Sequence, residues 1–167
     1  MKVDQIAYHC NTPEDELKVK RMYGLDAASW LKDAVTARGI VYGKTTTNVA
    51  LLQFNLDLGI QLELIRYKSG LFWYQHMVNA VQAPFIVHVG CHLADDEAWP
   101  LRHAKVVQEV ETISHTAPHL THGGEFAGRR YYYKIFQLNP HSFVKYIKRI
   151  HPIGGYGQAQ THTAASA

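Results

Sequence analysis

Two histidines lie at matching places in this sequence, each four residues after another polar side chain. The segment QIAYHCNTPED, which starts at Gln5, can be laid over HVGCHLADDEA, which starts at His88, so that Gln5 pairs with His88 and His9 with His92. Residues four apart on a strand share one face. An imidazole can hydrogen-bond a substrate, ligate a metal ion or act as a general base near neutral pH. His9 and His92 are therefore candidate site residues. The alternative is that both are strand-end histidines that touch solvent.

A second pair of matching segments follows at nearly the same offset. FNLDLGIQLELI, which starts at Phe54, can be laid over FQLNPHSFVKYI, which starts at Phe136, and this pairs Glu63 with Lys145. The two blocks are 82 to 83 residues apart, which is typical of a duplicated unit. A carboxylate and an ammonium at equivalent positions can form an ion pair between the two copies.

Both halves of the sequence predict the same order of elements, and each begins with a strand that an acidic turn ends. In the first half, Thr12 and Pro13 predict a helix start, and Gly24 predicts its end. The expected elements there are a strand at 2–10, this helix, a short helical turn at 26–33, and strands at 35–43, 48–57 and 60–68. The second half predicts a strand at 84–93, a short helix at 97–104, and strands at 106–115, 128–138 and 142–150.

Each half thus reads as a βαβββ module, so we expect an α+β protein. One helix leaves the other face of a four-stranded sheet uncovered, and two such sheets side by side can curve into a cup around a cavity. We place the first module at residues 1–69, a linker at 70–83, the second module at 84–151 and a flexible tail at 152–167.

Composition limits the classes of function. The chain has 167 residues and a net charge of +3, with 47% hydrophobic and 19% charged residues. These values predict a packed core and give no reason to expect a nucleic-acid partner. No apolar run is long enough for a membrane span, and no secretory signal is evident. Cys10 and Cys91 form no metal-binding or disulfide pattern, which favours a cytoplasmic location.

Three short segments carry a resemblance to a known superfamily. They are VDQIAY with its polar residue, LELI with its carboxylate and IVHVG with its histidine. With the paired modules, they resemble the vicinal oxygen chelate superfamily, which includes glyoxalases, extradiol dioxygenases and bleomycin-binding proteins. The resemblance covers about residues 1–151 and implies a cup formed by two modules, within one chain or by exchange in a homodimer.

The resemblance implies a set of metal ligands at four positions. These positions hold Gln5, Glu63, His88 and Lys145. The first three match glyoxalase-like ligands and would suit a divalent Mn, Fe, Co, Ni or Zn ion. The fourth departs from the pattern, because an ammonium is not a metal ligand. Two interpretations therefore stay open: a metal on Gln5, Glu63 and His88, or a cup with no metal in which Glu63 and Lys145 pair.

Two classes of function follow from these interpretations. The first is a lyase, isomerase or dioxygenase-like enzyme, possibly metal-dependent, that acts on a small substrate with vicinal oxygens. Lys145 and His92 would be its catalytic residues. The second is a protein that sequesters a small molecule without a metal, as bleomycin-resistance proteins do, by burial and stacking in an aromatic cup.

Other residues are candidates for the cup wall or for packing. Tyr131 and Tyr133 lie on one face of a predicted strand and could line the cavity with His9, although aromatic residues also favour strands for packing alone. The aromatic residues of 70–83, Phe72, Trp73 and Tyr74, are expected to pack in the core or between modules, and the alternative is that they form a wall of the cavity. The histidines of 115–122 lie in a predicted loop and are more typical of a surface than of a zinc site.

Overall fold

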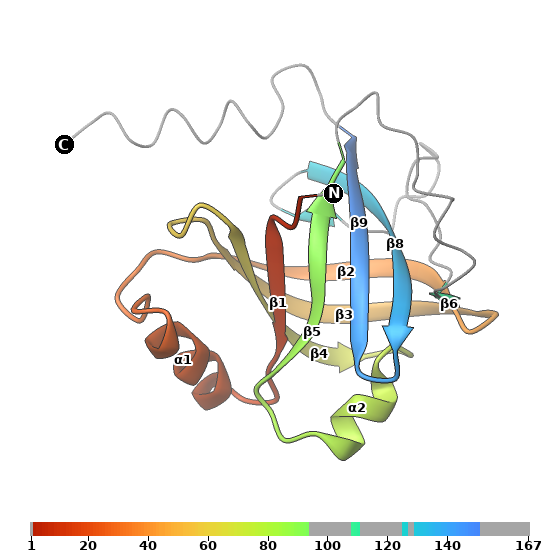
Figure 1. The fold of residues 1–167 in the computed structure, drawn as a ribbon, viewed down its shortest axis with the longest axis horizontal. Coiled ribbons are helices and arrows are strands. Elements are labelled where there is room, and N and C mark those ends of the chain that lie inside the picture. The colour runs from red at the N-terminus through yellow and green to blue at the C-terminus, as the bar shows by residue number, and fades with distance from the viewer. Residues whose placement is uncertain (1, 94–107, 111–124, 127–128, 151–167) are drawn as a thin grey trace.

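The computed structural model describes residues 2–93, 108–110, 125–126 and 129–150 (Figure 1). The first half of the chain holds β1 (Gln5–His9), α1 (Pro13–Met22), β2 (Leu31–Val41), β3 (Lys44–Asn55) and β4 (Gln61–Ser69). The second holds α2 (Gln75–Ala80), β5 (Phe85–His92), β6 (Gln108–Val110), β7 (Glu125–Phe126), β8 (Arg129–Asn139) and β9 (Ser142–Ile150). Among the described residues, no helix is long and apolar enough to cross a bilayer.

The described strands form one curled sheet. Its order is β2-β3-β4-β1-β5-β9-β8-β6, and β7 pairs with β8 beside this path. Four strands of each half of the chain thus lie together, and β1 and β5 join the halves as an antiparallel pair. In Figure 1, β2, β3 and β4 cross behind β5, β8 and β9, while β1 lies beside β5, so that the sheet is concave. We call this concave face the cup. The α+β cup predicted from the sequence is confirmed.

Helix α1 begins and ends where the sequence predicts. Thr12 accepts a hydrogen bond from the Asp15 backbone N–H, and the Asp15 carboxylate accepts one from the Thr12 N–H, which together form a capping box. Gly24 follows the helix with φ +69°, a conformation that glycine adopts without strain. Val19 packs against Leu62 and Leu64, so the helix covers the convex side of the first four strands.

Strands β2 and β3 both begin and end earlier in the chain than predicted. The short helical turn predicted at 26–33 is wrong from Leu31 onward, because β2 begins there and Leu31 pairs with Phe54 of β3. Pairing with a long partner strand extends β2 further than its local sequence indicates. Strand β9 has the predicted bounds, and the turn between β8 and β9 lies at Pro140 and His141 as expected.

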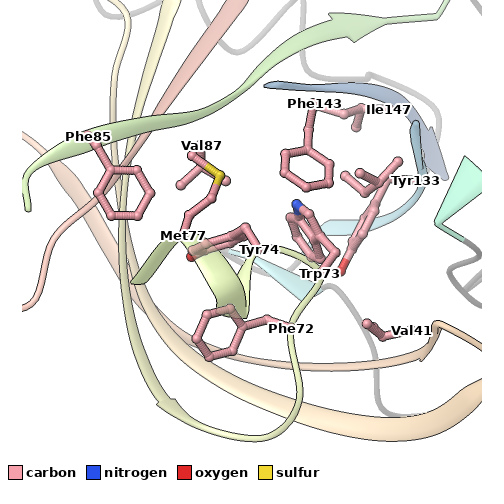
Figure 2. Close-up of a cluster of buried hydrophobic side chains, with 11 residues drawn as sticks. Val41, Phe72, Trp73, Tyr74, Met77, Phe85, Val87, Tyr133, Phe143 and Ile147 are labelled. Atoms are coloured by element: carbon pink, nitrogen blue, oxygen red, sulfur yellow. The ribbon is translucent and has the colours of Figure 1, made fainter. Parts of the chain in front are cut away.

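The aromatic segment between the halves is part of the core. Phe72, Trp73 and Tyr74 are buried, and α2 begins directly after them and contributes the buried Met77. Figure 2 shows these side chains among residues of β2, β5, β8 and β9. The expected packing role of residues 70–83 is therefore confirmed. The helix predicted at 97–104 and the histidine-containing stretch at 115–122 lie outside the described residues.

Candidate functional site

The strand register places the four predicted site residues around one point. Strand β1 pairs with β5 so that Gln5 lies opposite Gly90 and Ala7 opposite His88. Glu63 of β4 lies beside Ala7, and Lys145 of β9 lies beside Gly90. When 82 or 83 is added to the residue numbers of the first half, the pair of Ala7 with Glu63 becomes the pair of Gly90 with Lys145. The halves are therefore related by an approximate two-fold axis between β1 and β5.

The four side chains converge on that axis. His88 Nε2 lies 3.1 Å from Gln5 Oε1 and 3.2 Å from Glu63 Oε2. Lys145 Nζ lies 3.6 Å from the same Glu63 oxygen. All four residues are buried, Glu63 with an exposed fraction of 1% and Lys145 with 6%. We call Gln5, Glu63, His88 and Lys145 the axial tetrad.

Gly90 makes room for one member of the tetrad. A Cβ atom at position 90 would overlap Gln5 Oε1 and lie 2.8 Å from Gln5 Cβ. Because Gly90 lies directly opposite Gln5 across the β1–β5 pair, neither backbone can move aside without breaking the ladder. The absence of a side chain at Gly90 therefore lets the Gln5 amide reach His88.

Replacing Gly90 with alanine is expected to destabilise the protein by about 1–3 kcal/mol, the usual cost of overpacking a closed core. Thermal or denaturant unfolding of Gly90→Ala measures this loss. Ile86→Ala is the matched control, because Ile86 lies on the same strand with 47% of its surface exposed, and it should change stability by at most about 0.5 kcal/mol. Equal effects of the two substitutions would contradict the close packing of Gly90 on Gln5.

Hydrogen-bond chemistry sets the proton position on His88. Gln5 donates through its Nε2 to Gln61 Oε1, so its Oε1 faces His88 as an acceptor. The Glu63 carboxylate is also an acceptor, and His88 Nε2 must therefore carry the proton. Burial first, and then the nearby Lys145 cation, lower the pKa of His88 to about 4. His88 is thus a neutral hydrogen-bond donor at neutral pH.

Glu63 stays ionised although it is fully buried. Burial alone would raise its pKa, but the Lys145 cation and the His88 hydrogen bond outweigh burial and hold the pKa at about 2. The charges of Glu63 and Lys145 balance each other, so the tetrad has no net charge. A carboxylate and an imidazole with such low pKa values are poor general bases near neutral pH.

A narrow cavity adjoins the tetrad on the concave side of the sheet. Its wall combines apolar side chains of β2, β3 and β4 with polar groups and aromatic rings: Val35, Ala37, Asn48, Ala50, Leu52, Glu63, Ile65, Tyr67, Trp73, Tyr133 and Lys145. The empty volume is about 370 Å³ with the open mouth included, but the centre of a water molecule fits in only about 40 Å³. The space is therefore a slot rather than a wide bowl, and we call it the slot.

Aromatic rings form one side of the slot. Lys145 Nζ lies 4.8 Å from the centre of the Tyr133 ring, a cation–π distance. Trp73 and Tyr133 lie with ring centres 6.0 Å apart, and Figure 2 shows them next to each other. Burial raises the pKa of Tyr133, so its phenol keeps its proton. Tyr133 thus lies at the wall where the sequence placed it.

His9 and His92 are absent from the described slot wall. His9 is buried, contacts Tyr74 and Asn11 by hydrogen bonds, and packs against Phe72 and Phe85, so the expectation that it touches solvent is wrong. A register irregularity between Ala7 and Tyr8 interrupts the strand alternation that predicted a shared face for Gln5 and His9.

His92 does reach the surface, with 17% of its side chain exposed, and its Nδ1 lies 2.6 Å from Asp4 Oδ1. It ends β5 as expected and is absent from the slot wall. Tyr131 lies in β8 opposite Arg149, on the same strand as Tyr133. Its side chain is outside the described part of the structure.

Sequence reasoning missed Tyr67, Asn48 and the aliphatic wall residues. Asn48 lies in β3 between a polar run and an apolar run. Trp73, which the sequence left open between the cavity wall and packing, belongs to a segment that has no counterpart in the second half. A polar residue at a buried position of a strand is the one signal that could have identified Asn48, because such residues are seldom buried without a partner or a role.

The tetrad does not fit a resident divalent metal ion. His88 Nε2 uses its proton to bond Gln5 Oε1 and lies 3.2 Å from Glu63 Oε2, and the Lys145 ammonium lies against Glu63 where a fourth ligand would stand. Within the described ranges, no group of three or more His, Cys, Asp and Glu side chains is placed to hold a metal.

Comparisons with known proteins add two similar folds. The chain matches no protein-family model and no curated protein. A solved variant of Streptomyces coelicolor methylmalonyl-CoA epimerase, in complex with 2-nitronate-propionyl-CoA, aligns over 90% of this chain and 99% of its own, with 10% identity and a TM-score of 0.44. A xylose isomerase-like TIM barrel/4-hydroxyphenylpyruvate dioxygenase fusion protein aligns over 99% of this chain but 30% of its own, with 13% identity and a TM-score of 0.37.

The strand order and the register describe the fold without these scores. Four strands from each half lie around β1 and β5, and one approximate two-fold axis relates the pairs at Ala7 and Gly90. This chain has a cupped α+β fold whose two halves are related by that axis.

Proposed function

We propose that this protein binds a small, flat, uncharged molecule in the slot and does so without a metal ion. The observation that carries the proposal is the contact of Lys145 Nζ with Glu63 Oε2 at 3.6 Å. This ammonium supplies the positive charge that balances the buried carboxylate. The axial tetrad is then complete in itself, and the cup wall is left to bind a ligand.

Charge and shape select the class of ligand. Because Glu63 and Lys145 already neutralise each other, a charged ligand would add an unbalanced charge to a buried site, which is costly. The wall offers small and branched aliphatic side chains opposite the rings of Trp73 and Tyr133. Such a slot favours a planar apolar body with a carbonyl oxygen that can accept from the Lys145 ammonium.

The second candidate is the metal-dependent enzyme, and one observation favours it. Gln5 Oε1, Glu63 Oε2 and His88 Nε2 converge with separations of 3.1 and 3.2 Å from the imidazole nitrogen. Such a set could hold a metal only if Lys145 withdrew and His88 lost its Nε2 proton. Metal analysis of the purified protein distinguishes the two candidates.

Untagged protein is expected to contain far less than one equivalent of transition metal and to bind 4-acetylbiphenyl in saturable fashion. An untagged chain is needed because the protein already has 11 histidines. Calorimetry should show at least about tenfold weaker binding of the nearly isosteric 4-biphenylcarboxylate, since that ligand brings the unbalanced charge.

Ala50→Leu is the matched control for the place of binding. Ala50 lines the slot and is no part of the axial tetrad, so a larger side chain there should block the ligand and leave the tetrad intact. Binding that survives Ala50→Leu unchanged, or near-stoichiometric metal in the wild type, would overturn the proposal.

A further inference from the structure

Asn48 is a buried polar residue at the end of the slot remote from the axial tetrad. It lies in β3, its exposed fraction is 5%, and it is part of the slot wall. Asn48 precedes Phe54 by six residues in β3, and Phe54 pairs with Glu63 of β4. The distance along β3 from Asn48 to the level of Glu63 is therefore ~20 Å. The slot therefore has a polar group at each end and an apolar stretch between them.

A short hydrogen-bond chain fixes the orientation of the Asn48 amide. The Leu71 backbone N–H donates to Thr46 Oγ1 at 3.1 Å, and the Thr46 hydroxyl donates to Asn48 Oδ1 at 3.2 Å. The amide oxygen is therefore the acceptor within the protein, and the Nδ2 group is left as a donor. Within the described ranges, the hydrogen bond of the Asn48 side chain is the one that its Oδ1 accepts from Thr46.

The turn after β4 holds the same amide in place. Gly70 has φ +98°, and a Cβ atom there would overlap both Asn48 Oδ1 and the Thr47 carbonyl oxygen. The backbone thus packs directly on the oxygen side of the amide. Asn48 has one available orientation, with its oxygen against the turn and its donor directed away from it.

We propose that Asn48 is a specificity-determining residue that donates a hydrogen bond to the far end of an elongated ligand. This inference rests on the proposed function and narrows its ligand class. The wall between the two polar groups consists of aliphatic side chains and of the rings of Trp73 and Tyr133, which favour a flat apolar body. The ligand is then a planar body of at least two rings with an acceptor oxygen at each end, one for Lys145 and one for Asn48.

The test compares 4,4′-diacetylbiphenyl with 4-acetylbiphenyl, which lacks the second carbonyl group. Wild-type protein should bind the first about tenfold more tightly, as expected for one additional buried hydrogen bond. Asn48→Leu, which has a similar volume and no donor, should remove this preference, so that the variant binds the two ketones with equal affinity. Asn48→Asp is a second variant that keeps the Thr46 bond and replaces the donor by an acceptor, so it should also lose the preference.

The outcomes separate the two proposals. Equal affinities of the wild type for the two ketones, or a preference that persists in both Asn48 variants, would overturn the role of Asn48 and leave the slot as a binding site. Failure of the wild type to bind 4-acetylbiphenyl at all would overturn the proposed function itself. Thermal unfolding of each variant without ligand verifies that it is folded before binding is compared.

Discussion

Lys145→Glu is expected to convert a protein that binds no metal into one that takes up about one divalent ion per chain. The substitution removes the ammonium beside Glu63 and places a second carboxylate next to Gln5, Glu63 and His88. Without metal, two buried carboxylates would face each other, and we expect a loss of about 3–5 kcal/mol of stability. A metal ion would restore the charge balance and draw the proton from His88 Nε2.

Two measurements check this result. Metal analysis after dialysis should show near-stoichiometric Mn, Co, Ni or Zn in Lys145→Glu and none in the wild type. Adding metal at about a thousand times its Kd should stabilise the variant by about 4 kcal/mol, which corresponds to a rise in Tm of roughly 10 °C for a chain of this size. The wild type should show no such rise.

A charge swap is the matched control. In the double variant Glu63→Lys with Lys145→Glu, the ion pair is kept with its ends exchanged, because the two positions are related by the two-fold axis. This variant should regain part of the lost stability and bind no metal. If Lys145→Glu neither binds metal nor loses stability, Lys145 and Glu63 are not partners in solution.

The internal repeat made the axial tetrad predictable from the sequence. Matching segments 82 to 83 residues apart imply equivalent strands, and equivalent strands around a two-fold axis bring their matched residues together. Glu63 pairs with Ala7, and Lys145 pairs with Gly90, as that offset predicts. This prediction used the match between the two halves and no secondary-structure propensity of single residues. It therefore did not depend on where each strand begins and ends.

The residues that the repeat does not cover could not be placed in the same way. Trp73 reaches the slot from a segment between the halves, so no symmetry argument applies to it. His9 is covered by the repeat, but the irregularity after Ala7 separates its environment from that of His92. Tertiary packing of Phe72 and Phe85 around His9 decides its burial, and strand alternation alone carries no information about such packing.

Acid is expected to destabilise this protein well above the pH at which carboxylates usually protonate. The pKa of His88 is about 4 in the folded protein and about 6.5 in an unfolded chain. Between these values the unfolded state binds the proton and the folded state does not, so stability falls as the pH decreases. The pKa of Glu63, about 2 against an ordinary 4.5, extends the loss in the same direction from pH 4.5 downward.

Each of these two groups contributes about 3 kcal/mol over its full range. Denaturant unfolding at pH 7 and pH 4 should therefore show a drop of at least about 3 kcal/mol in the free energy of unfolding. Burial also lowers the pKa of His9, which adds to the drop. His88→Gln keeps an N–H donor for Glu63 and Gln5 but cannot titrate, so the variant should lose about 3 kcal/mol of the drop.

His141→Gln is the matched control, because His141 is an exposed histidine in the turn between β8 and β9. It should show the same dependence on pH as the wild type. A stability that stays constant from pH 7 to pH 4 in the wild type would mean that His88 is protonated in the folded protein. His88 would then be a cation beside Lys145, and the balance of charge on which the closed, metal-free tetrad depends would be lost.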